Sequence, residues 1–316
     1  MRVLLWHVHG SWTTAFVQGD HEYVVPVLPD RGPDGRGRAD TYDWPASVRE
    51  ATPAQLRELD FDVVVLQRPH ELAHLCEDWL GRRPGRDVPC VYVEHNAPQG
   101  RIAEMRHPAA DRGDVLIAHV THFNDLFWDC GRTPTTVVEH GIVDPGYRYT
   151  GELPHQAIVI NEARRRGRVT GTDLLPRLAE AAPIDLYGID AGALGGFDDV
   201  PQALMHDELA RRRVYTHPIR WTSLGLSLLE AMHLGMPVVA LATTEAIEAV
   251  PAGAGVLSTD VDVLVEAVRT YVAEPERAAA DGVRARRAAL ARYGLERFVD
   301  DWEATLRSVA SRQVRA

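Results

Sequence analysis

The feature that most constrains the fold is an alternation of short β-branched runs with helical segments, which starts twice along the chain. Such alternation is typical of parallel α/β sheets, and 316 residues exceed what one hydrophobic core usually supports. We therefore expect two α/β domains. The expected strands of the first are Val3–Val8, Tyr23–Val27, Val63–Gln67, Val91–His95, Leu116–Thr121 and Thr136–Glu139. After a loop rich in Gly, Pro and Tyr, those of the second are Ala157–Ile160, Ile184–Tyr187, Val214–His217, Pro237–Leu241 and Gly255–Ser258.

Charge excludes one broad class of partner. The net charge of −11 argues against a general nucleic-acid binder, because neutralising phosphates requires a surplus of basic groups. The sequence contains no lysine, so all 34 residues counted as Lys+Arg are arginine. Any anionic ligand must therefore be met locally by arginines, histidines or backbone N–H groups.

Hydropathy and cysteine usage indicate a cytoplasmic protein. No stretch approaches the roughly 20 apolar residues that a membrane span needs, and the N-terminal residues lack a cleavage-type region. Cys76, Cys90 and Cys130 are isolated and show no metal-type spacing. We expect neither a disulfide framework nor a zinc site.

Two other segments have a clear local character. Asp30–Asp43 is rich in Gly and Arg and has no apolar period, so we expect a surface loop. Val263–Ala310 is typical of helices interrupted at Tyr293–Gly294. Phe298, Trp302 and Leu306 recur there at four-residue spacing, which predicts an apolar stripe packed against another element.

The segment most informative about chemistry is Thr216–Ala240, which predicts a strand, a tight loop, a helix and another strand. Gly225, near the helix start, lets backbone approach a ligand, and free N–H groups at a helix N-terminus favour a phosphate. Glu230 follows on the same helix among apolar residues. A carboxylate in such a setting needs a hydrogen-bond partner, and it can accept two hydrogen bonds from a ribose diol.

This segment resembles the donor motif of the retaining glycosyltransferases of family 4, a group with the GT-B fold. The motif runs E-x-F-G-x-x-x-x-E-A-M-x-x-G-x-P-V-V-A, and the resemblance implies that its residues bind the nucleotide sugar. The corresponding residues here are Thr222, Ser223, Leu224, Gly225, Leu226, Glu230, Ala231, Met232, Gly235, Pro237, Val238, Val239 and Ala240. The departure is Thr222, which replaces an acid that lies near the donor sugar in the family. A threonine can form hydrogen bonds but carries no charge.

A second family feature is an arginine and a lysine-glycine pair that neutralise the donor diphosphate. If Gly171 matches the family glycine, Thr170 stands at the lysine position and Arg165 at the arginine position. Arg168 is then a candidate to replace the missing cation, because arginine is always charged and forks onto phosphate oxygens. The spacing alone leaves the choice among Arg165, Arg166 and Arg168 open, and a solvated basic loop is the structural alternative.

The first half contains weaker matches. Gly10 follows the first strand, where the family has a glycine loop facing the donor phosphates. His95 ends a strand at the family's position for a histidine beside the transferred sugar, although a lone histidine is often structural. His140, Gly141 and Asp144 resemble a turn into the linker, and we expect them to be architectural.

The resemblance implies a GT-B architecture of two Rossmann-like domains whose parallel sheets face across a cleft. The expected parts are an acceptor domain at residues 1–150, a donor domain at 151–290, and a helix at 291–316 that crosses back to the acceptor domain. The implied activity is that of a hexosyltransferase. It transfers a sugar, with retained anomeric configuration, from a nucleotide diphosphate sugar to a small-molecule, lipid or glycan hydroxyl.

In this mechanism the leaving diphosphate helps to deprotonate the acceptor, so neither a cofactor nor a metal is implied. His95, Arg165 and Arg168 are the expected catalytic residues. Two alternatives remain open: a non-catalytic GT-B protein that binds a nucleotide sugar or activates a partner enzyme, and a nucleotide-sugar epimerase. A nicotinamide dehydrogenase is disfavoured, because no G-x-G-x-x-G follows the first strand. The sequence leaves the nucleotide base, the sugar, the acceptor and homo-oligomerisation undetermined.

Overall fold

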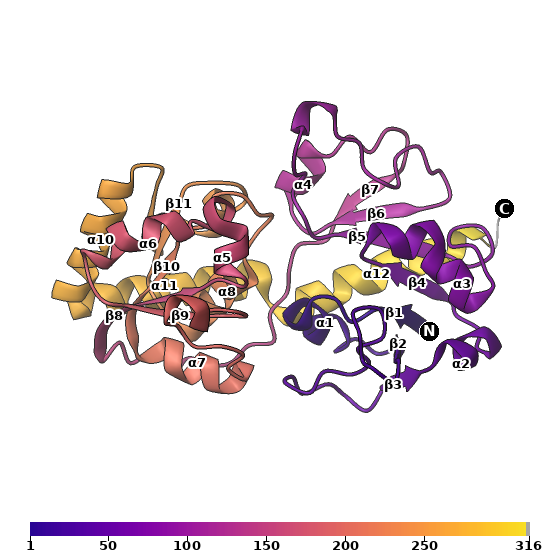
Figure 1. Ribbon diagram of the computed structural model, residues 1–316, viewed down its shortest axis with the longest axis horizontal. Coiled ribbons are helices and arrows are strands. Elements are labelled where there is room, and N and C mark those ends of the chain that lie inside the picture. Colours follow the sequence, from indigo (N-terminus) through magenta and orange to yellow (C-terminus); the bar gives the residue numbers. More distant parts are fainter. Residues whose placement is uncertain (314–316) are drawn as a thin grey trace. The chain divides into compact units, whose positions relative to one another are not determined.

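The computed structural model describes residues 1–313, and the chain folds into two compact α/β units (Figure 1). Unit 1 comprises Met1–Gly141 together with the C-terminal residues from Leu295 onward, and unit 2 comprises Ile142–Gly294. Within the described residues, no helix combines the length and the apolar character that crossing a membrane would require.

Unit 1 is built on a seven-stranded sheet in the order β3-β2-β1-β4-β5-β6-β7, in which every neighbouring pair is parallel. The order reverses between β1 and β4. The strands are β1 (Arg2–Leu5), β2 (Glu22–Pro26), β3 (Val48–Ala51), β4 (Val63–Leu66), β5 (Cys90–Glu94), β6 (Leu116–His119) and β7 (Thr135–Val137). The helices are α1 (Gly10–Phe16), α2 (Pro53–Glu58), η1 (Glu71–Leu75), α3 (Cys76–Leu80), η2 (Ile102–Glu104), α4 (His122–Phe127) and α12 (Leu295–Gln313).

The apolar stripe of α12 packs within unit 1. The Trp302 ring lies 5.6 Å from that of Trp12 and 5.1 Å from that of Phe16, both edge to face, on α1. Phe298 is fully buried and lies so close to Gly141 that a β-carbon there would clash. Aromatic packing of this kind makes α12 part of the core of unit 1.

Unit 2 has a five-stranded parallel sheet in the order β12-β11-β10-β8-β9, so its order reverses between β8 and β10. The strands are β8 (Leu153–Val159), β9 (Ile184–Tyr187), β10 (Arg212–His217), β11 (Val238–Leu241) and β12 (Gly255–Ser258). The helices are α5 (Ala163–Arg166), η3 (Gly167–Thr170), η4 (Thr172–Leu174), α6 (Leu175–Ala179), η5 (Gly192–Leu194), α7 (Gln202–Arg211), α8 (Leu226–Leu234), α9 (Ala246–Ala249), α10 (Val261–Ala273) and α11 (Pro275–Tyr293).

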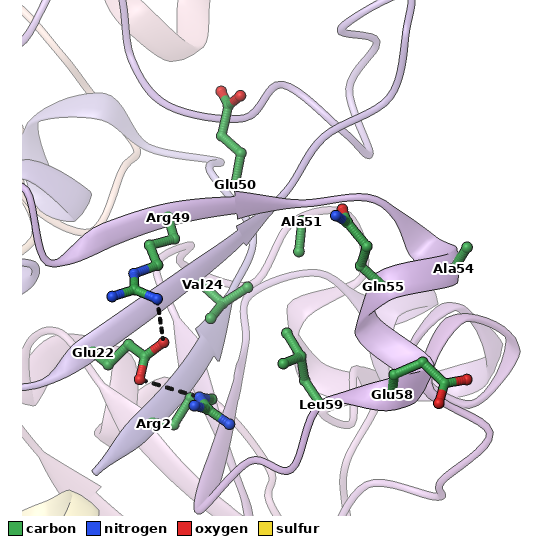
Figure 2. A pocket seen from close by; sticks show the side chains of 10 residues that line it. All are labelled: Arg2, Glu22, Val24, Arg49, Glu50, Ala51, Ala54, Gln55, Glu58 and Leu59. Carbon is green, nitrogen blue, oxygen red and sulfur yellow. Dashed lines mark ion pairs between the residues drawn. The ribbon is translucent and has the colours of Figure 1, made fainter.

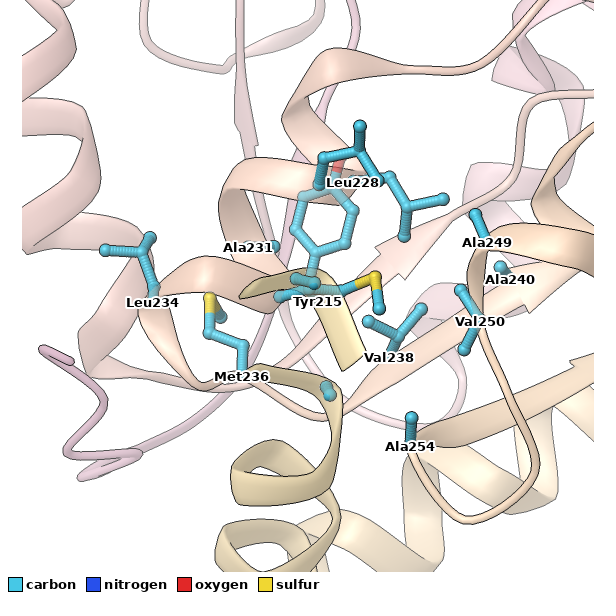
Figure 3. Packing of buried hydrophobic residues seen from close by; sticks show 14 of the residues in the cluster. Tyr215, Leu228, Ala231, Leu234, Met236, Val238, Ala240, Ala249, Val250 and Ala254 are labelled. Atoms are coloured by element: carbon cyan, nitrogen blue, oxygen red, sulfur yellow. The ribbon is translucent and has the colours of Figure 1, made fainter. Parts of the chain in front are cut away.

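The core of unit 2 surrounds α8, which is apolar on nearly all sides and buried from Leu228 to Leu234. Figure 3 shows Leu228, Ala231 and Leu234 of this helix beside Tyr215 and the strand residues that follow. A helix that is hydrophobic all round belongs inside a protein, and this position fixes the helix start at the edge of the sheet.

The predicted strands agree with the structure in place and type, with shifts of a few residues at their ends. One strand, β3, was not predicted. Its sequence, Val-Arg-Glu-Ala, has charged residues at its centre because it is an edge strand whose Arg49 side chain is 72% exposed.

Candidate functional site

The carboxyl edge of the unit 2 sheet at β8 and β10 is the natural ligand position in this fold, since ligands of open α/β sheets bind where the strand order reverses. The loops that follow these two strands touch. Gly171 has φ +75°, and a β-carbon built on it would lie 1.9 Å from the carbonyl oxygen of Pro218. Glycine is therefore required for this contact, which holds the loop after β8 against the loop after β10.

The helix α8 begins immediately after the second of these loops. Gly225 precedes its first residue, Leu226, and provides no side-chain cap for its N–H groups. A β-carbon on Gly225 would lie 2.5 Å from Cε1 of His217, so a glycine is needed here as well. Burial lowers the pKa of His217 to about 4, which keeps this imidazole neutral near pH 7. The N-terminus of α8 therefore packs closely against His217, the last residue of β10.

Glu230 is buried on the second turn of α8, with 3% of its surface exposed. Its Oε1 accepts a hydrogen bond of 2.8 Å from Nε2 of Gln202, and its Oε2 lies 3.5 Å from Nε2 of His206. Both partners belong to α7, where their four-residue spacing puts them on one face. These two partners were not predicted from the sequence, although their four-residue spacing is visible in it.

The remaining residues of the expected donor motif lie in the loop before α8. Thr222 is partly exposed, whereas Leu224 is buried in the core and Leu226 packs against that core. Ligand contacts from Leu224 and Leu226 would therefore come from backbone N–H groups rather than from side chains. Trp221 donates its backbone N–H to the carbonyl oxygen of Val169, a further link between the two loops.

The arginines after β8 are exposed and paired with carboxylates. Arg165 binds Glu162 through Nε at 2.7 Å, and the Arg168 Nη1 lies 2.9 Å from Asp173 Oδ2. Asp173 also accepts from Arg220, which with Arg168 holds the pKa of the Asp173 carboxyl below its usual value. The guanidinium groups remain accessible, since the side chains of Arg165 and Arg168 are 67% and 77% exposed.

Thr170, which stands at the family's lysine position, is completely buried. Its Oγ1 donates to the carbonyl oxygen of Gly167 at 3.2 Å and lies 3.1 Å from Oγ1 of Thr172. This threonine therefore shapes the loop and presents no group to a ligand at the surface. A cation for a diphosphate would have to come from one of the neighbouring arginines.

In unit 1, Gly10 is the first residue of α1, beside the end of β1. A β-carbon at Gly10 would lie 2.5 Å from the Tyr42 ring, so the loop Asp30–Asp43 reaches this glycine. That segment was expected to be a surface loop. It is irregular and largely exposed, but it is also anchored, because the Arg38 guanidinium donates to the carbonyl oxygens of Trp44 and Pro45.

His95 follows β5 and is almost fully buried. Its Nε2 lies 2.9 Å from Oε1 of Gln67, which follows β4, and its ring centroid is 4.3 Å from that of His9. The Trp12 ring meets His95 edge to face at 4.9 Å. Burial, with the neighbouring His9 and His140, holds the pKa of His95 well below its usual value. A neutral imidazole in this position can exchange hydrogen bonds with a sugar hydroxyl.

No cluster of three or more His, Cys, Asp or Glu side chains within residues 1–313 has the arrangement of a metal site. A cavity of about 470 Å³ lies at the amino-terminal side of β1 and β2, away from the expected site (Figure 2). Glu22 pairs there with Arg2 and Arg49, above an apolar floor that includes Val24 and Leu59. None of the predicted site residues lines this cavity.

Two parallel sheets, each with a strand-order reversal and a glycine at the start of a helix beside it, are typical of the GT-B class of protein. Solved structures of this class share the fold at low identity. They include sucrose-phosphate synthase of Thermosynechococcus elongatus, with 13% identity, a TM-score of 0.72 and coverage of 98% of this chain and 99% of that one. HepE of Anabaena in complex with UDP-glucose shows 16% identity, a TM-score of 0.68 and coverage of 98% and 100%.

A TarM variant of S. aureus, in complex with fondaparinux, α-GlcNAc-glycerol and UDP, has 13% identity and a TM-score of 0.65. It covers 80% of this chain, which spans only 58% of the TarM chain. No curated protein shows significant sequence similarity. Residues 176–274 match the family model described as glycosyl transferases group 1. The predicted GT-B fold is thus confirmed, and the predicted resemblance to group 1 glycosyltransferases is borne out over residues 176–274.

Proposed function

We propose that this protein is a retaining hexosyltransferase that moves a sugar from a nucleotide diphosphate sugar to a hydroxyl acceptor. The observation that carries the proposal is the buried carboxylate of Glu230, five residues after the glycine that precedes α8. It lies on the helix that follows β10, one of the two strands at the strand-order reversal of unit 2. This segment is matched by the group 1 glycosyltransferase model. A carboxylate at this place suits the two hydroxyls of a ribose.

The donor would be held by unit 2. In this proposal the backbone N–H groups at Gly225 and Leu226 face the phosphates, while Arg165 and Arg168 neutralise them from the loop after β8. These arginines would exchange their present carboxylate partners for phosphate oxygens, which their exposure permits. UDP is the nucleotide we favour, because the HepE and TarM structures contain UDP or UDP-glucose.

The chemistry would use the leaving group as its base. As the bond between the anomeric carbon and the diphosphate oxygen breaks, negative charge grows on that oxygen, which accepts the proton of the acceptor hydroxyl while the acceptor oxygen bonds the anomeric carbon on the same face. Charge stabilisation by preorganised N–H groups and arginines is the main contribution expected of the protein. We assign His95 to the transferred sugar and Gly10 to a backbone contact with the phosphates.

Three buried free cysteines support a cytoplasmic location as part of this proposal, since oxidising compartments favour disulfides. Burial raises the pKa of the Cys130 thiol to about 11 and that of Cys76 to about 12, so neither is a reactive thiolate near pH 7.

The decisive experiment is a thermal-shift panel of UDP, GDP, ADP and dTDP, repeated by calorimetry with excess chelator. A ligand that binds only the folded state raises the melting temperature by mass action. We expect one nucleotide to bind, and to do so equally well with and without chelator. Loss of all binding on chelation would overturn the metal-independent model, and no shift with any of the four nucleotides would overturn the proposed donor site.

A non-catalytic nucleotide-sugar-binding protein is the second candidate. It is favoured by Thr222 and by Thr170, whose buried hydroxyl is no substitute for the family's lysine. Release of glucose from UDP-glucose, followed over hours at high protein concentration, separates the two. Donor binding without any turnover, with a range of acceptors present, would favour the non-catalytic protein. Interconversion of the bound sugar to its epimer would instead indicate a nucleotide-sugar epimerase.

A further inference from the structure

The carboxyl edge of the unit 1 sheet gathers basic side chains where the strand order reverses. β1 leads into His7 and His9, and β4, its neighbour across the reversal, leads into Gln67 and Arg68. This is the position at which open α/β sheets bind ligands. The edge lies wholly within unit 1, so its properties can be considered on their own.

A hairpin after β2 lies beside this edge. Val27 and Arg36 form an antiparallel bridge, and Gly37 donates its N–H to the carbonyl oxygen of Pro26. The carbonyl oxygen of Gly37 in turn lies 3.1 Å from Nδ1 of His7, which joins the hairpin to the end of β1.

Glu50 of β3 fixes the hairpin from its other side. Its Oε1 accepts the backbone N–H of Arg38 at 2.8 Å and pairs with Arg31 at 3.0 Å. These hydrogen bonds lower the pKa of the Glu50 carboxyl despite partial burial, so the anchor is ionised near pH 7. The hairpin is therefore held in one shape before any ligand arrives.

Arg36 differs from the other arginines of this unit. Among residues 1–141, its guanidinium alone has no hydrogen bond or ion pair within the part of the chain that the structure describes, and its side chain is exposed. Arg31 and Arg38, its neighbours on the same segment, are both used to hold the loop. Arg36 is thus an exposed cation on an anchored hairpin, in a chain with a net charge of −11.

Arg68 is a second cation at this edge, and it and Arg36 act on the same histidine. Burial, followed by the charges of Arg36, Arg68 and His7, lowers the pKa of His9 to about 4. The Nη2 atom of Arg68 is buried without a hydrogen-bond partner, although Asp34 and Glu71 pair with the rest of this guanidinium. Asp34 and Glu71 are thus engaged by Arg68, whereas Asp40, whose charge acts on His7, is a remaining acidic group at this edge.

We propose that Arg36, with the imidazole of His9, forms a subsite for a phosphate group carried by the acceptor. This inference rests on the proposed function and names its acceptor class: a hydroxyl compound that bears a phosphate ester. The forked guanidinium of Arg36 carries several N–H donors and the neutral imidazole of His9 can add one, which suits the terminal oxygens of a phosphate. The donor diphosphate has its own cations, Arg165 and Arg168, in unit 2.

The test uses the full-length protein saturated with UDP, so that the donor site is filled. Glycerol 3-phosphate and glycerol are titrated into the wild type, Arg36→Gln and Arg49→Gln by calorimetry. Arg49 is a matched control, because it is an exposed arginine of the same unit that lies on β3. We expect glycerol 3-phosphate to bind the wild type and Arg49→Gln, glycerol to bind neither, and Arg36→Gln to bind the phosphate at least about tenfold more weakly.

Three results would overturn the inference: equal binding of glycerol and glycerol 3-phosphate, unchanged phosphate binding in Arg36→Gln, or competition between the phosphate probe and UDP. A weaker affinity of Arg36→Gln for UDP would also overturn it, because Arg36 would then serve the donor. Failure of the wild type to bind UDP is a separate outcome that concerns the proposed function. In that case the probe is titrated without UDP, and the comparison of Arg36→Gln with Arg49→Gln still decides the phosphate subsite.

The phosphate can belong to a soluble metabolite or to a lipid headgroup. A second arm therefore measures sedimentation with vesicles of phosphatidic acid in phosphatidylcholine, compared with phosphatidylcholine alone. If Arg36→Gln weakens binding of glycerol 3-phosphate alone, the acceptor is a soluble compound. If it weakens binding to the phosphatidic acid vesicles, the acceptor is a lipid. If neither arm depends on Arg36, the subsite does not exist.

Discussion

At the residue scale, the most informative side chain is Glu230, because its two proposed roles predict different measurements. Its carboxylate already has protein partners in Gln202 and His206. If these residues orient it toward a ribose, removing its charge weakens nucleotide binding. If the three residues only satisfy one another inside the core, the same change affects stability alone.

We predict that Glu230→Gln lowers nucleotide affinity by roughly tenfold or more, because a hydrogen bond to a charged group contributes on the order of 1.5 to 3 kcal/mol. Calorimetry with the nucleotide and a thermal melt are measured on the same sample. Glu248→Gln, an exposed glutamate of unit 2, is the control. Normal affinity in a destabilised Glu230→Gln would remove the main support for the donor site.

At the scale of elements, unit 2 depends on the contact between the loops after β8 and β10. This contact exists only because Gly171 has no side chain to clash with Pro218. The loop after β8 carries Arg165 and Arg168, and the loop after β10 leads into α8. The distance between these two loops therefore sets the distance between the proposed phosphate contacts.

We predict that Gly171→Ala is much more destabilising than Gly195→Ala. Both glycines have a positive φ, +75° and +78°, which places an alanine under strain of about 1 to 3 kcal/mol. A β-carbon at Gly195 meets nothing within 4 Å, whereas one at Gly171 meets the Pro218 carbonyl oxygen. Chemical denaturation measures both. Equal losses would show that the clash is relieved by small movements and that the loop contact is not rigid.

At the scale of the whole molecule, the C-terminal helix α12 completes unit 1. Its residues Phe298 and Trp302 are buried against α1, and their removal would expose Trp12 and Phe16. We predict that a chain ending at Gly294 loses solubility or cooperative unfolding. A chain ending at Arg307 keeps the aromatic contacts and is the control. If the shorter chain melts like the full one, α12 is not part of the core of unit 1.

Acidification should also destabilise the molecule. Burial lowers the pKa of His119 and His217 to about 4, and that of His140 to about 3, whereas an unfolded histidine titrates near 6.5. Between these values the unfolded chain binds more protons. The free energy of unfolding is therefore greatest above about pH 6.5. It decreases as the pH falls below this value, by up to about 1.4 kcal/mol per pH unit for each histidine.

Urea unfolding at pH 7 and pH 5 measures this slope. We predict a smaller slope for His217→Asn, which removes one of the titrating groups. The comparison uses the change with pH and not the stability itself, because the substitution also alters packing. An identical slope in His217→Asn and the wild type would contradict a neutral buried His217.

The sequence by itself determined the two α/β halves, the parallel strands and the start of α8 at Gly225. These features depend on local periodicity and on glycine at a helix start, and both are written in consecutive residues. It also determined the resemblance carried by Glu230, because that motif is contiguous.

Only the tertiary structure decided which distant residues meet. Gln202 and His206 reach Glu230 because α7 packs beside α8, and Gly171 meets Pro218 because β8 and β10 are neighbours. The edge strand β3 was missed because one exposed side lets it carry charged residues, and Arg36 was one basic residue among many until the hairpin placed it without a partner. Such pairings depend on chain reversals over tens of residues, which no local pattern records.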